Sequence, residues 1–296
     1  MHTKHQIQQL LASAGVFPNK HFGQHFLIDL NLMRLLIDSA HIGSDDIVLE
    51  VGCGTGSLTE GLADLAGFCI AVEVDDTLAK IAQEQLAEKD NVAVINTDIL
   101  ESKHTISGTV IEAISQARKK YSGRLLLVAN LPYNVACPVM LNLVTGPTVA
   151  DEMYVTVQKQ VAERMSAKPG SGDYGTLSIF LIATGQVKTE RILKPTVFWP
   201  QPLVESAMVS FVRNQEKVNR IKNIELFGEV INLFMGHRRK MLKACTKFAG
   251  GELSRIDNWP EIFEQCSIEP TQRPEKLPPE DYIAIANLCR ERVTAV

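Results

Sequence analysis

"IVLEVGCGTGSLTEGLADLAG" (residues 47–67) begins with an apolar, β-branched run and continues into three alternating glycines and a segment of helical period. A strand buried on both faces of a sheet has such a near-continuous apolar run. Glycines directly after a strand permit a tight turn and let a ligand approach the backbone, and the helix that follows completes a βα unit. The stretch therefore predicts the first strand and helix of an open α/β sheet.

The same pattern recurs along the first half of the chain. Further strands are expected at residues 69–75, 91–98, 125–130 and 152–158, with helices between them and an additional helix near residues 110–121. Strands that alternate with helices form a parallel sheet that is covered on both faces.

The pattern changes beyond the last of these strands. Residues 187–193 and 206–213 alternate like half-exposed strands, and from about residue 218 the chain has the pattern of helices only. We therefore expect an α/β, Rossmann-like sheet, mostly parallel with one antiparallel strand, and a small all-α C-terminal domain. The expected parts are an N-terminal arm at 1–28, a sheet domain at 29–215 and a helical domain at 216–296.

Composition narrows the class of protein. The chain has 296 residues, of which 45% are hydrophobic, so it can bury a sizeable core. Its six cysteines form no C-x-x-C pair, and no histidine stands at metal spacing from them, which favours reduced thiols in a cytoplasmic protein without a metal site. No window has the length and apolarity of a membrane span, so no membrane partner is expected.

The net charge of −4 gives no indication of a nucleic-acid partner. The charge is unevenly distributed, however, and one segment of the chain is basic. No acidic residue lies between Glu229 and Glu252. The segment is predicted to be helical, with its basic side chains spread over one helix face and its flank. Such a face either contacts RNA phosphates or is merely solvated. The candidate RNA-binding residues are Arg238, Arg239, Lys240 and Lys243.

Candidate ligand-binding residues follow the first three strands. Ligands of open parallel sheets bind at the carboxyl ends of the strands. Glu73 follows the second strand and can accept hydrogen bonds from both ribose hydroxyls, while Asp98 follows the third and can accept from the amino group of an adenine. A plain βα turn and two solvated acids are the alternative. The spacing of Gly52, Gly54 and Gly56 is one residue short of the dinucleotide fingerprint, which favours S-adenosylmethionine over NAD.

The end of the fourth strand carries an unusual tetrad, Asn130-Leu131-Pro132-Tyr133. The side-chain oxygen of Asn130 and the carbonyl of Leu131 can accept both hydrogens of one amino group, and Pro132 restricts the backbone that carries this carbonyl. Tyr133 offers a flat face on which a base can stack. The tetrad predicts a site where the amine of an extruded adenine accepts a methyl group. An Asx-capped turn with a core tyrosine is the alternative.

Several longer motifs resemble those of the ribosomal RNA adenine N6-dimethyltransferases, in particular the small-subunit dimethyladenosine transferases. The resemblance covers almost the whole chain. It rests on "HFGQHFLID", "VLEVGCGTGSLT", "NLPYN", "VQKQVAERMSAKPGSGDYGTLSI", "VFWPQPLVESAMV" and "FMGHRRKMLK".

This resemblance implies roles for individual residues. The fold would be that of a class I S-adenosylmethionine-dependent methyltransferase. His25 and Leu27 would line the methionine side of the cofactor, although His25 stands where the family usually has asparagine. Phe198 resembles the second aromatic residue that sandwiches the target base. Phe198 could instead be core packing, with Trp199 in the outer position.

The resemblance also implies a substrate. A monomer would use S-adenosylmethionine to dimethylate N6 of two adjacent adenines in the 3′-terminal hairpin loop of 16S ribosomal RNA, within the assembling small ribosomal subunit. Three alternatives remain open: a related enzyme that dimethylates large-subunit ribosomal RNA and confers antibiotic resistance, a DNA adenine methyltransferase, and a non-catalytic factor on the same fold.

Overall fold

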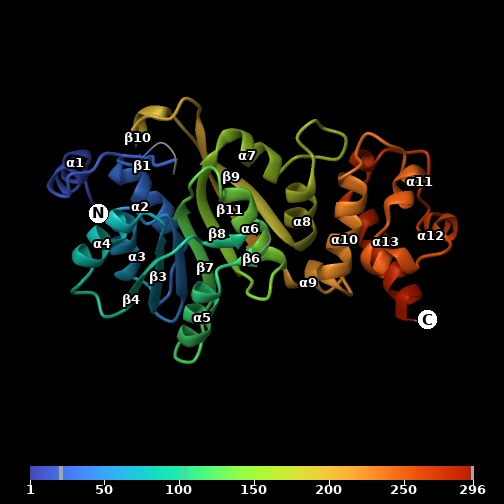
Figure 1. Cartoon of the computed structure of the whole chain (residues 1–296), viewed down its shortest axis with the longest axis horizontal. Helices are drawn as coiled ribbons and strands as arrows, with labels where there is room; N and C mark the ends of the chain where they lie inside the picture. Colours follow the sequence, from blue (N-terminus) through green and yellow to red (C-terminus); the bar gives the residue numbers. More distant parts are fainter. Residues whose placement is uncertain (20–22, 104, 295–296) are drawn as a thin grey trace. The chain divides into compact units, whose positions relative to one another are not determined.

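The computed structural model describes residues 1–19, 23–103 and 105–294 and divides them into two compact units (Figure 1). Unit 1 comprises Met1–Ala162 and Lys188–Val212, and unit 2 comprises Glu163–Val187 and Arg213–Val296. Unit 2 thus contains residues 163–187 in addition to the C-terminal range expected from the sequence.

A seven-stranded sheet forms the centre of unit 1, with strand order β4-β3-β2-β7-β8-β11-β9. Its strands are β2 (Ile47–Val51), β3 (Phe68–Glu73), β4 (Val92–Asn96), β7 (Leu125–Asn130), β8 (Glu152–Gln158), β9 (Gly185–Leu193) and β11 (Ser206–Arg213). The ladders from β4 through β8 are parallel, and β11 pairs with β8 in the antiparallel direction. The predicted mostly parallel α/β sheet is confirmed.

The apolar runs that predicted the strands are buried in this sheet. Every residue of β2 is buried, and so is every residue of β7 except Asn130 at its carboxyl end. Two helices, α2 (Leu30–Ser39) and α3 (Ser57–Ala63), pack on one face, where Leu36 and Leu62 contact the sheet core around Val48. The helix α4 (Asp76–Gln85) adds Ala82 against Ala71 of β3. Burial of these apolar faces is the main stabilising contribution.

Of three further helices in unit 1, the first precedes all the strands and the other two connect successive strands. They are α1 (Lys4–Ser13), α5 (Gly108–Ala117) and α6 (Ala136–Thr145). The helix expected near residues 110–121 is therefore present as α5, two residues earlier at its start.

Two short strand pairs in unit 1 were not predicted. The pair β5 (Leu100–Ser102) and β6 (Thr105–Ile106) precedes α5. The pair β1 (Phe26–Leu27) and β10 (Phe198–Trp199) joins the N-terminal arm to the segment between β9 and β11. Strands of two or three residues are too short to show a periodic pattern.

Unit 2 is helical. Its helices include α8 (Thr176–Thr184), α10 (Ile224–Met235), α11 (Leu242–Cys245), α12 (Trp259–Gln265) and α13 (Pro279–Thr294). The ring of Phe234 lies 6.0–6.4 Å from those of Trp259, Phe263 and Tyr282, and these aromatic side chains form the core of the unit.

The predicted helix through the basic segment is wrong. Helix α10 ends at Met235, a turn follows, and the short helix α11 begins only at Leu242. The chain changes direction because Leu242 and Cys245 are fully buried, while Arg239 and Lys240 remain exposed in the turn. The basic side chains therefore do not share one helix face.

None of the helices in the described part of the chain combines the length and the apolarity needed to cross a bilayer.

Candidate active site

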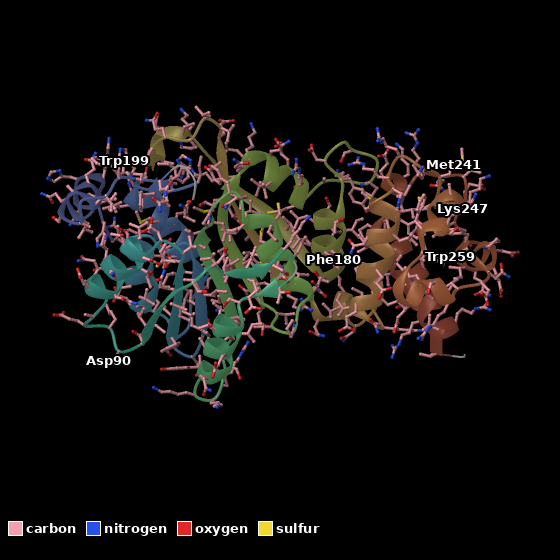
Figure 2. The ribbon with its side chains drawn as sticks, in the orientation of Figure 1. Asp90, Phe180, Trp199, Met241, Lys247 and Trp259 are labelled. Atoms are coloured by element: carbon pink, nitrogen blue, oxygen red, sulfur yellow. The ribbon has the colours of Figure 1, made fainter. Side chains whose placement is uncertain are left out.

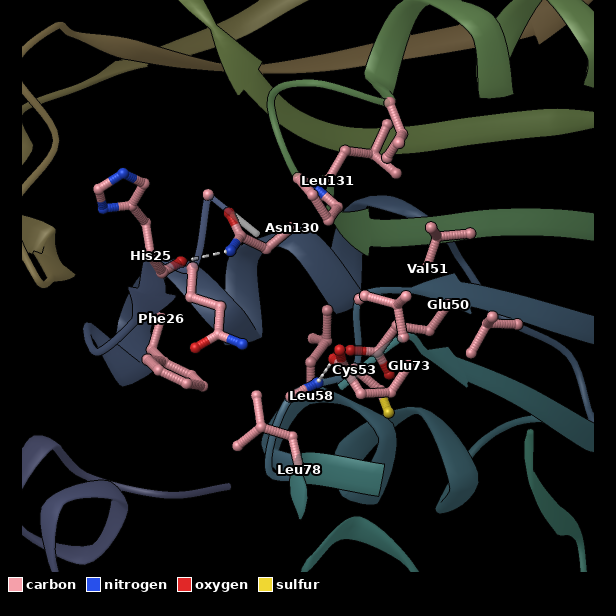
Figure 3. A pocket seen from close by; sticks show the side chains of 18 of the residues that line it. His25, Phe26, Glu50, Val51, Cys53, Leu58, Glu73, Leu78, Asn130 and Leu131 are labelled. Carbon is pink, nitrogen blue, oxygen red and sulfur yellow. Dashed lines mark hydrogen bonds between the residues drawn. The ribbon is translucent and has the colours of Figure 1, made fainter. Parts of the chain in front are cut away.

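A cavity of about 290 Å³ opens at the carboxyl ends of β2, β3 and β7 in unit 1 (Figure 3). The strand ends converge there because they are parallel and adjacent in the sheet. The predicted site residues that line it are His25, Leu27, Gly52, Gly54, Glu73, Asp98, Asn130, Leu131, Pro132 and Tyr133. Residues separated by more than one hundred positions in the sequence are thus brought together.

The glycine loop forms the floor of the cavity. Gly52 and Gly54 have φ angles of 76° and 57°, in the left-handed region that glycine adopts without strain. A Cβ on Gly52 would lie 2.8 Å from Cγ of Pro132, and one on Gly54 would lie 2.9 Å from the Phe26 ring. The loop therefore needs glycine both for its backbone and for close packing. Gly56 does not line the cavity; it precedes α3 and packs against Leu86.

Glu73 is held in place by two backbone donors. One carboxylate oxygen accepts from the amide of Gly54 at 2.8 Å and the other from the amide of Asp75 at 3.0 Å. Burial raises the pKa of Glu73, although both hydrogen bonds oppose this shift. Asp98 is exposed at the cavity edge, where its carboxylate accepts from the amide of Leu100 at 2.9 Å.

The side-chain amide of Asn130 is oriented by two contacts. Its Nδ2 donates to the main-chain carbonyl of His25 at 2.8 Å, as Figure 3 shows, and its Oδ1 accepts from the hydroxyl of Thr156 at 2.5 Å. Thr156 is reachable because it pairs with Asn130 in the β7–β8 register. The amide oxygen keeps a second lone pair, and among the described residues no donor is bonded to the Leu131 carbonyl.

Thr156 was not identified from the sequence. It is buried, with 1% of its surface exposed, in the middle of the apolar strand "EMYVTVQ". A polar residue at a core position of a strand next to the tetrad is the signal that could have identified it.

Two aromatic rings, those of Tyr133 and His25, lie together beside the tetrad. Tyr133 is half-buried, and its hydroxyl shares a 2.7 Å hydrogen bond with that of Ser206. Burial raises the pKa of Tyr133. The ring of His25 faces that of Tyr133 at 5.5 Å with a tilt of 30°, and the Nδ1 of His25 donates to the carbonyl of Pro200 at 2.7 Å.

Phe198 does not line the cavity. Only 1% of its surface is exposed, because it packs with Leu27, Leu32, Met33 and Leu193. The adjacent Trp199 is half-buried and stacks on Phe26, with ring centroids 6.2 Å apart. Trp199 is likewise not among the residues that line the cavity, so in this structure Phe198 lies in the core and Trp199 packs on Phe26 beside it.

The cavity is acidic. Glu50, Glu73 and Asp98 line it, whereas no lysine or arginine is found among its described lining residues. Burial raises the pKa of Glu50 to about 8, despite the 2.6 Å hydrogen bond that it accepts from Thr59. Glu50 therefore holds its proton near neutral pH, so the negative charge of the lining comes from Glu73 and Asp98. With no described cation beside them, this charge suits a cationic ligand and disfavours a polyphosphate.

The four predicted RNA-binding residues belong to unit 2 and are not among the residues that line this cavity. Arg238 is engaged within the unit, since its guanidinium pairs with Glu275 at 3.1 Å and donates to the carbonyl of Gly172 at 3.3 Å. Arg239, Lys240 and Lys243 are exposed. Across the described ranges, no group of three or more His, Cys, Asp or Glu residues is arranged to hold a metal ion.

Comparisons with known proteins bear on the fold and on the family. Among solved structures, the fold is similar to that of a dimethyladenosine transferase from Plasmodium falciparum, with a TM-score of 0.72 at 20% identity over 89% of this chain and 97% of that one. It is also similar to the 23S rRNA methyltransferase ErmE, with a TM-score of 0.57 at 20% identity over 91% and 99%.

Curated sequences are more similar. The chain is 33% identical to "Ribosomal RNA small subunit methyltransferase A" of Latilactobacillus sakei, over 96% of this chain and 94% of that protein. It is 34% identical to the protein of the same name from Streptococcus agalactiae, over 95% of each. The sequence model described as "Ribosomal RNA adenine dimethylase" matches residues 17–290. The chain is therefore a member of the ribosomal RNA adenine dimethylase family.

Proposed function

We propose that the chain transfers methyl groups from S-adenosylmethionine to N6 of two adjacent adenines in the 3′-terminal hairpin loop of 16S ribosomal RNA, acting as a monomer on the assembling small subunit. The observation that carries the proposal is the orientation of Asn130. Its amide oxygen and the carbonyl of Leu131 are two acceptors at the mouth of an acidic cavity, at the end of β7.

The residues of the cavity fit the cofactor. Gly52 and Gly54 leave a floor that a single Cβ would obstruct, Glu73 presents buried carboxylate oxygens for ribose hydroxyls, and Asp98 stands at the edge for an adenine amine. The acidic lining matches the positive charge of a sulfonium. When bound, the cofactor supplies an electrophilic methyl group. His25 and Leu27 line the same cavity beside Asn130 and are proposed to face its methionine end.

Asn130 and Leu131 prepare the target amine. An exocyclic amine conjugated with a purine ring is planar and a poor nucleophile. Two acceptors that bind both of its hydrogens direct the nitrogen lone pair out of the ring plane, while Thr156 and the His25 carbonyl hold the amide in the required orientation. No general base is required before attack, because the positive charge that develops on the nitrogen makes its proton acidic. A monomethylated amine still has one hydrogen to donate, so the same pair can serve the second transfer.

Tyr133 is proposed to stack on the extruded base. Its hydroxyl contact with Ser206 fixes the ring, and this orientation does not depend on substrate. For the opposite face of the base, the half-buried Trp199 is available as it stands, whereas Phe198 would first have to leave its core position.

The exposed basic side chains of unit 2 are proposed to contact RNA phosphates. Arg239, Lys240 and Lys243 are available for such contacts, and each contact would add to the salt dependence of binding. Arg238 contributes only if its pairing with Glu275 is exchanged for a phosphate.

Dimethylation of large-subunit ribosomal RNA is the second candidate, since ErmE has a related fold. The names of the more similar curated relatives favour the small subunit.

A direct test uses isotopically labelled S-adenosylmethionine with purified small and large ribosomal subunits from cells that lack this chain. The expected result is dimethylation of two adjacent adenines of the small-subunit RNA, located by mass mapping, with none for Asn130→Ala. Labelling of the large subunit alone would support the second candidate. A chain that neither binds the cofactor nor transfers methyl groups would instead be a non-catalytic factor.

A further inference from the structure

One exposed aromatic ring of unit 2 lies within the basic segment. Phe248 ends the short 3-10 helix Thr246–Phe248, and 51% of its surface is exposed. The ring of His237 stacks against it, with centroids 4.0 Å apart and planes within 13°. The Nδ1 of His237 donates to the carbonyl of Leu233 at 2.9 Å, so the imidazole is fixed on the last turn of α10. Phe248 is therefore an exposed ring supported by an anchored one.

One cationic side chain lies over this pair of rings, and three more are close in the sequence. The Lys240 ammonium lies over the Phe248 ring, 5.6 Å from its centroid, and Arg239, Lys243 and Lys247 are exposed nearby in the chain. Lys247 and Met241, both labelled in Figure 2, are exposed. Acidic groups flank the segment. Glu229 faces Gly251, Glu252 follows it, Glu275 is paired with Arg238, and the exposed Glu269 precedes Pro270, whose carbonyl accepts from the Lys243 amide.

This combination is typical of a surface that holds a nucleic-acid strand. Every base has a π-face that can stack on an aromatic ring, and every phosphate carries a charge that lysine and arginine neutralise. An isolated exposed phenyl ring is ordinary on a protein surface. Here the ring stacks on His237, has a cation over it and belongs to a sequence segment with five basic residues and no acidic one, which disfavours a neutral or basic protein partner.

We propose that the Phe248 platform, defined as Phe248, His237 and Lys240, stacks one unpaired base of an RNA strand whose phosphates contact Arg239, Lys243 and Lys247. The inference rests on the proposed action on ribosomal RNA and adds a base contact to it, outside the cavity of unit 1. The platform has no base-sequence specificity, because every base can stack on an aromatic ring. It binds an unpaired strand in preference to a duplex, because in a duplex the faces of the bases are covered by their neighbours.

The test measures binding of the full-length chain, without cofactor, to a short oligouridylate and to a duplex RNA of equal length. Phe248→Leu keeps an apolar side chain against His237 but removes the π-face, and it is expected to weaken oligouridylate binding by roughly 5- to 100-fold while duplex binding changes by less than about twofold. The salt dependence of oligouridylate binding should be unchanged, because no phosphate contact is lost. Phe248→Tyr should restore affinity.

Two control variants distinguish the effect of losing a stacking ring from the effect of losing a charge and from the effect of removing any exposed ring. Lys247→Gln should weaken binding of both RNAs and lower the slope of log affinity against log salt by about 0.7–0.9. Phe17→Leu removes another exposed ring, 89% exposed in the N-terminal arm, and should leave both affinities unchanged.

The proposal is overturned if Phe248→Leu binds oligouridylate as tightly as the parent, or if it loses both RNA forms equally. It is also overturned if RNA binding is retained but association with a protein of the small subunit is lost, which would make the platform a protein contact. Because binding is measured without turnover, a chain that binds through Phe248 but transfers no methyl group would refute the proposed function and leave this inference standing.

Discussion

At the scale of single residues, the site depends on how an amide is oriented. A free asparagine side chain can rotate, and either of its two ends can face a ligand. In this chain Thr156 bonds to the oxygen and the His25 carbonyl bonds to the nitrogen, so the acceptor end of Asn130 is assigned before any substrate arrives. Such preorganisation lowers the cost of ordering the site during the reaction.

Thr156→Val tests this orientation. The two side chains have similar shapes, so the main change is loss of one hydrogen bond to Asn130, worth about 0.5–1.5 kcal/mol. We expect the maximal rate of methyl transfer to fall roughly 3- to 10-fold while cofactor affinity, measured by calorimetry, stays within about twofold. Thr156→Ser, which restores the hydroxyl, should recover the rate. An unchanged rate in Thr156→Val would show that the hydroxyl is not needed.

Glu50 makes stability depend on pH. Its pKa rises from an ordinary 4.5 to about 8 in the folded chain, chiefly through burial. Between these values the folded chain keeps a proton that the unfolded chain has lost, so the stabilisation present below the lower value is lost progressively as pH rises toward the upper one.

We therefore expect the urea midpoint of the parent to fall more between about pH 5 and pH 8 than that of Glu50→Gln, whose side chain is neutral throughout. Glu84→Gln, at an exposed position of α4, should behave as the parent does. Equal pH dependence in the parent and Glu50→Gln would contradict a proton held on Glu50.

At the scale of elements, the glycine loop and the tetrad loop pack against each other. Gly52 follows β2 beside the proposed cofactor site, and Pro132 lies in the loop that is proposed to hold the target amine. The space between them admits no additional carbon, since a Cβ on residue 52 would lie 2.8 Å from Pro132. The two loops are thus joined by direct contact of the Gly52 backbone with the ring of Pro132 and not by a long side chain.

Gly52→Ala should therefore affect both loops. The alanine must adopt a φ of 76° and displace Pro132, at a cost of about 1–3 kcal/mol in stability. Turnover should fall further than cofactor affinity, because the tetrad is displaced. Gly172→Ala, where nothing lies within 4 Å of the added carbon, is the matched control. Thermal unfolding and single-turnover assays measure the two effects; a fully active Gly52→Ala would argue against this contact.

The elements also show what sequence reasoning can reach. Strands β2, β3, β4, β7 and β8 were predicted because each is a run of apolar residues long enough to show its pattern. The position of Phe198 was left open, since its burial depends on pairing with Leu27 far away in the sequence. The contribution of Thr156 depends on the register between β7 and β8. Hydrophobic periodicity predicts which face of a strand or helix a residue lies on, but not which distant residue it contacts. It also did not indicate where α10 ends.

At the scale of the whole molecule, charge is distributed unevenly. The chain carries a net charge of −4, the cavity of unit 1 is lined by acidic groups, and five basic residues without an acidic one lie between Glu229 and Glu252 in unit 2. A cationic cofactor and a polyanionic RNA are attracted to opposite signs of charge, so the two ligands do not compete for the same surface.

Arg238 and Arg239 should differ in how much each contributes to RNA binding. Arg239→Gln removes an exposed charge and is expected to lower the salt slope of ribosomal RNA binding by about 0.7–0.9. Arg238→Gln removes the partner of Glu275 and is expected to leave that slope unchanged while lowering stability by about 1 kcal/mol or less. Affinities across a salt series and thermal unfolding distinguish the two. Equal slopes for both variants would place Arg238 at the RNA as well.

The bond between Asn130 and residue 25 has a consequence for how this enzyme can diverge. The acceptor is a peptide oxygen, which all twenty amino acids possess, so a substitution at position 25 need not alter the bond. The imidazole of His25 is then free to make its own contacts, with Tyr133 and with the Pro200 carbonyl. Position 25 can thus vary over generations and modify the wall of the base pocket while the machinery for methyl transfer is inherited intact.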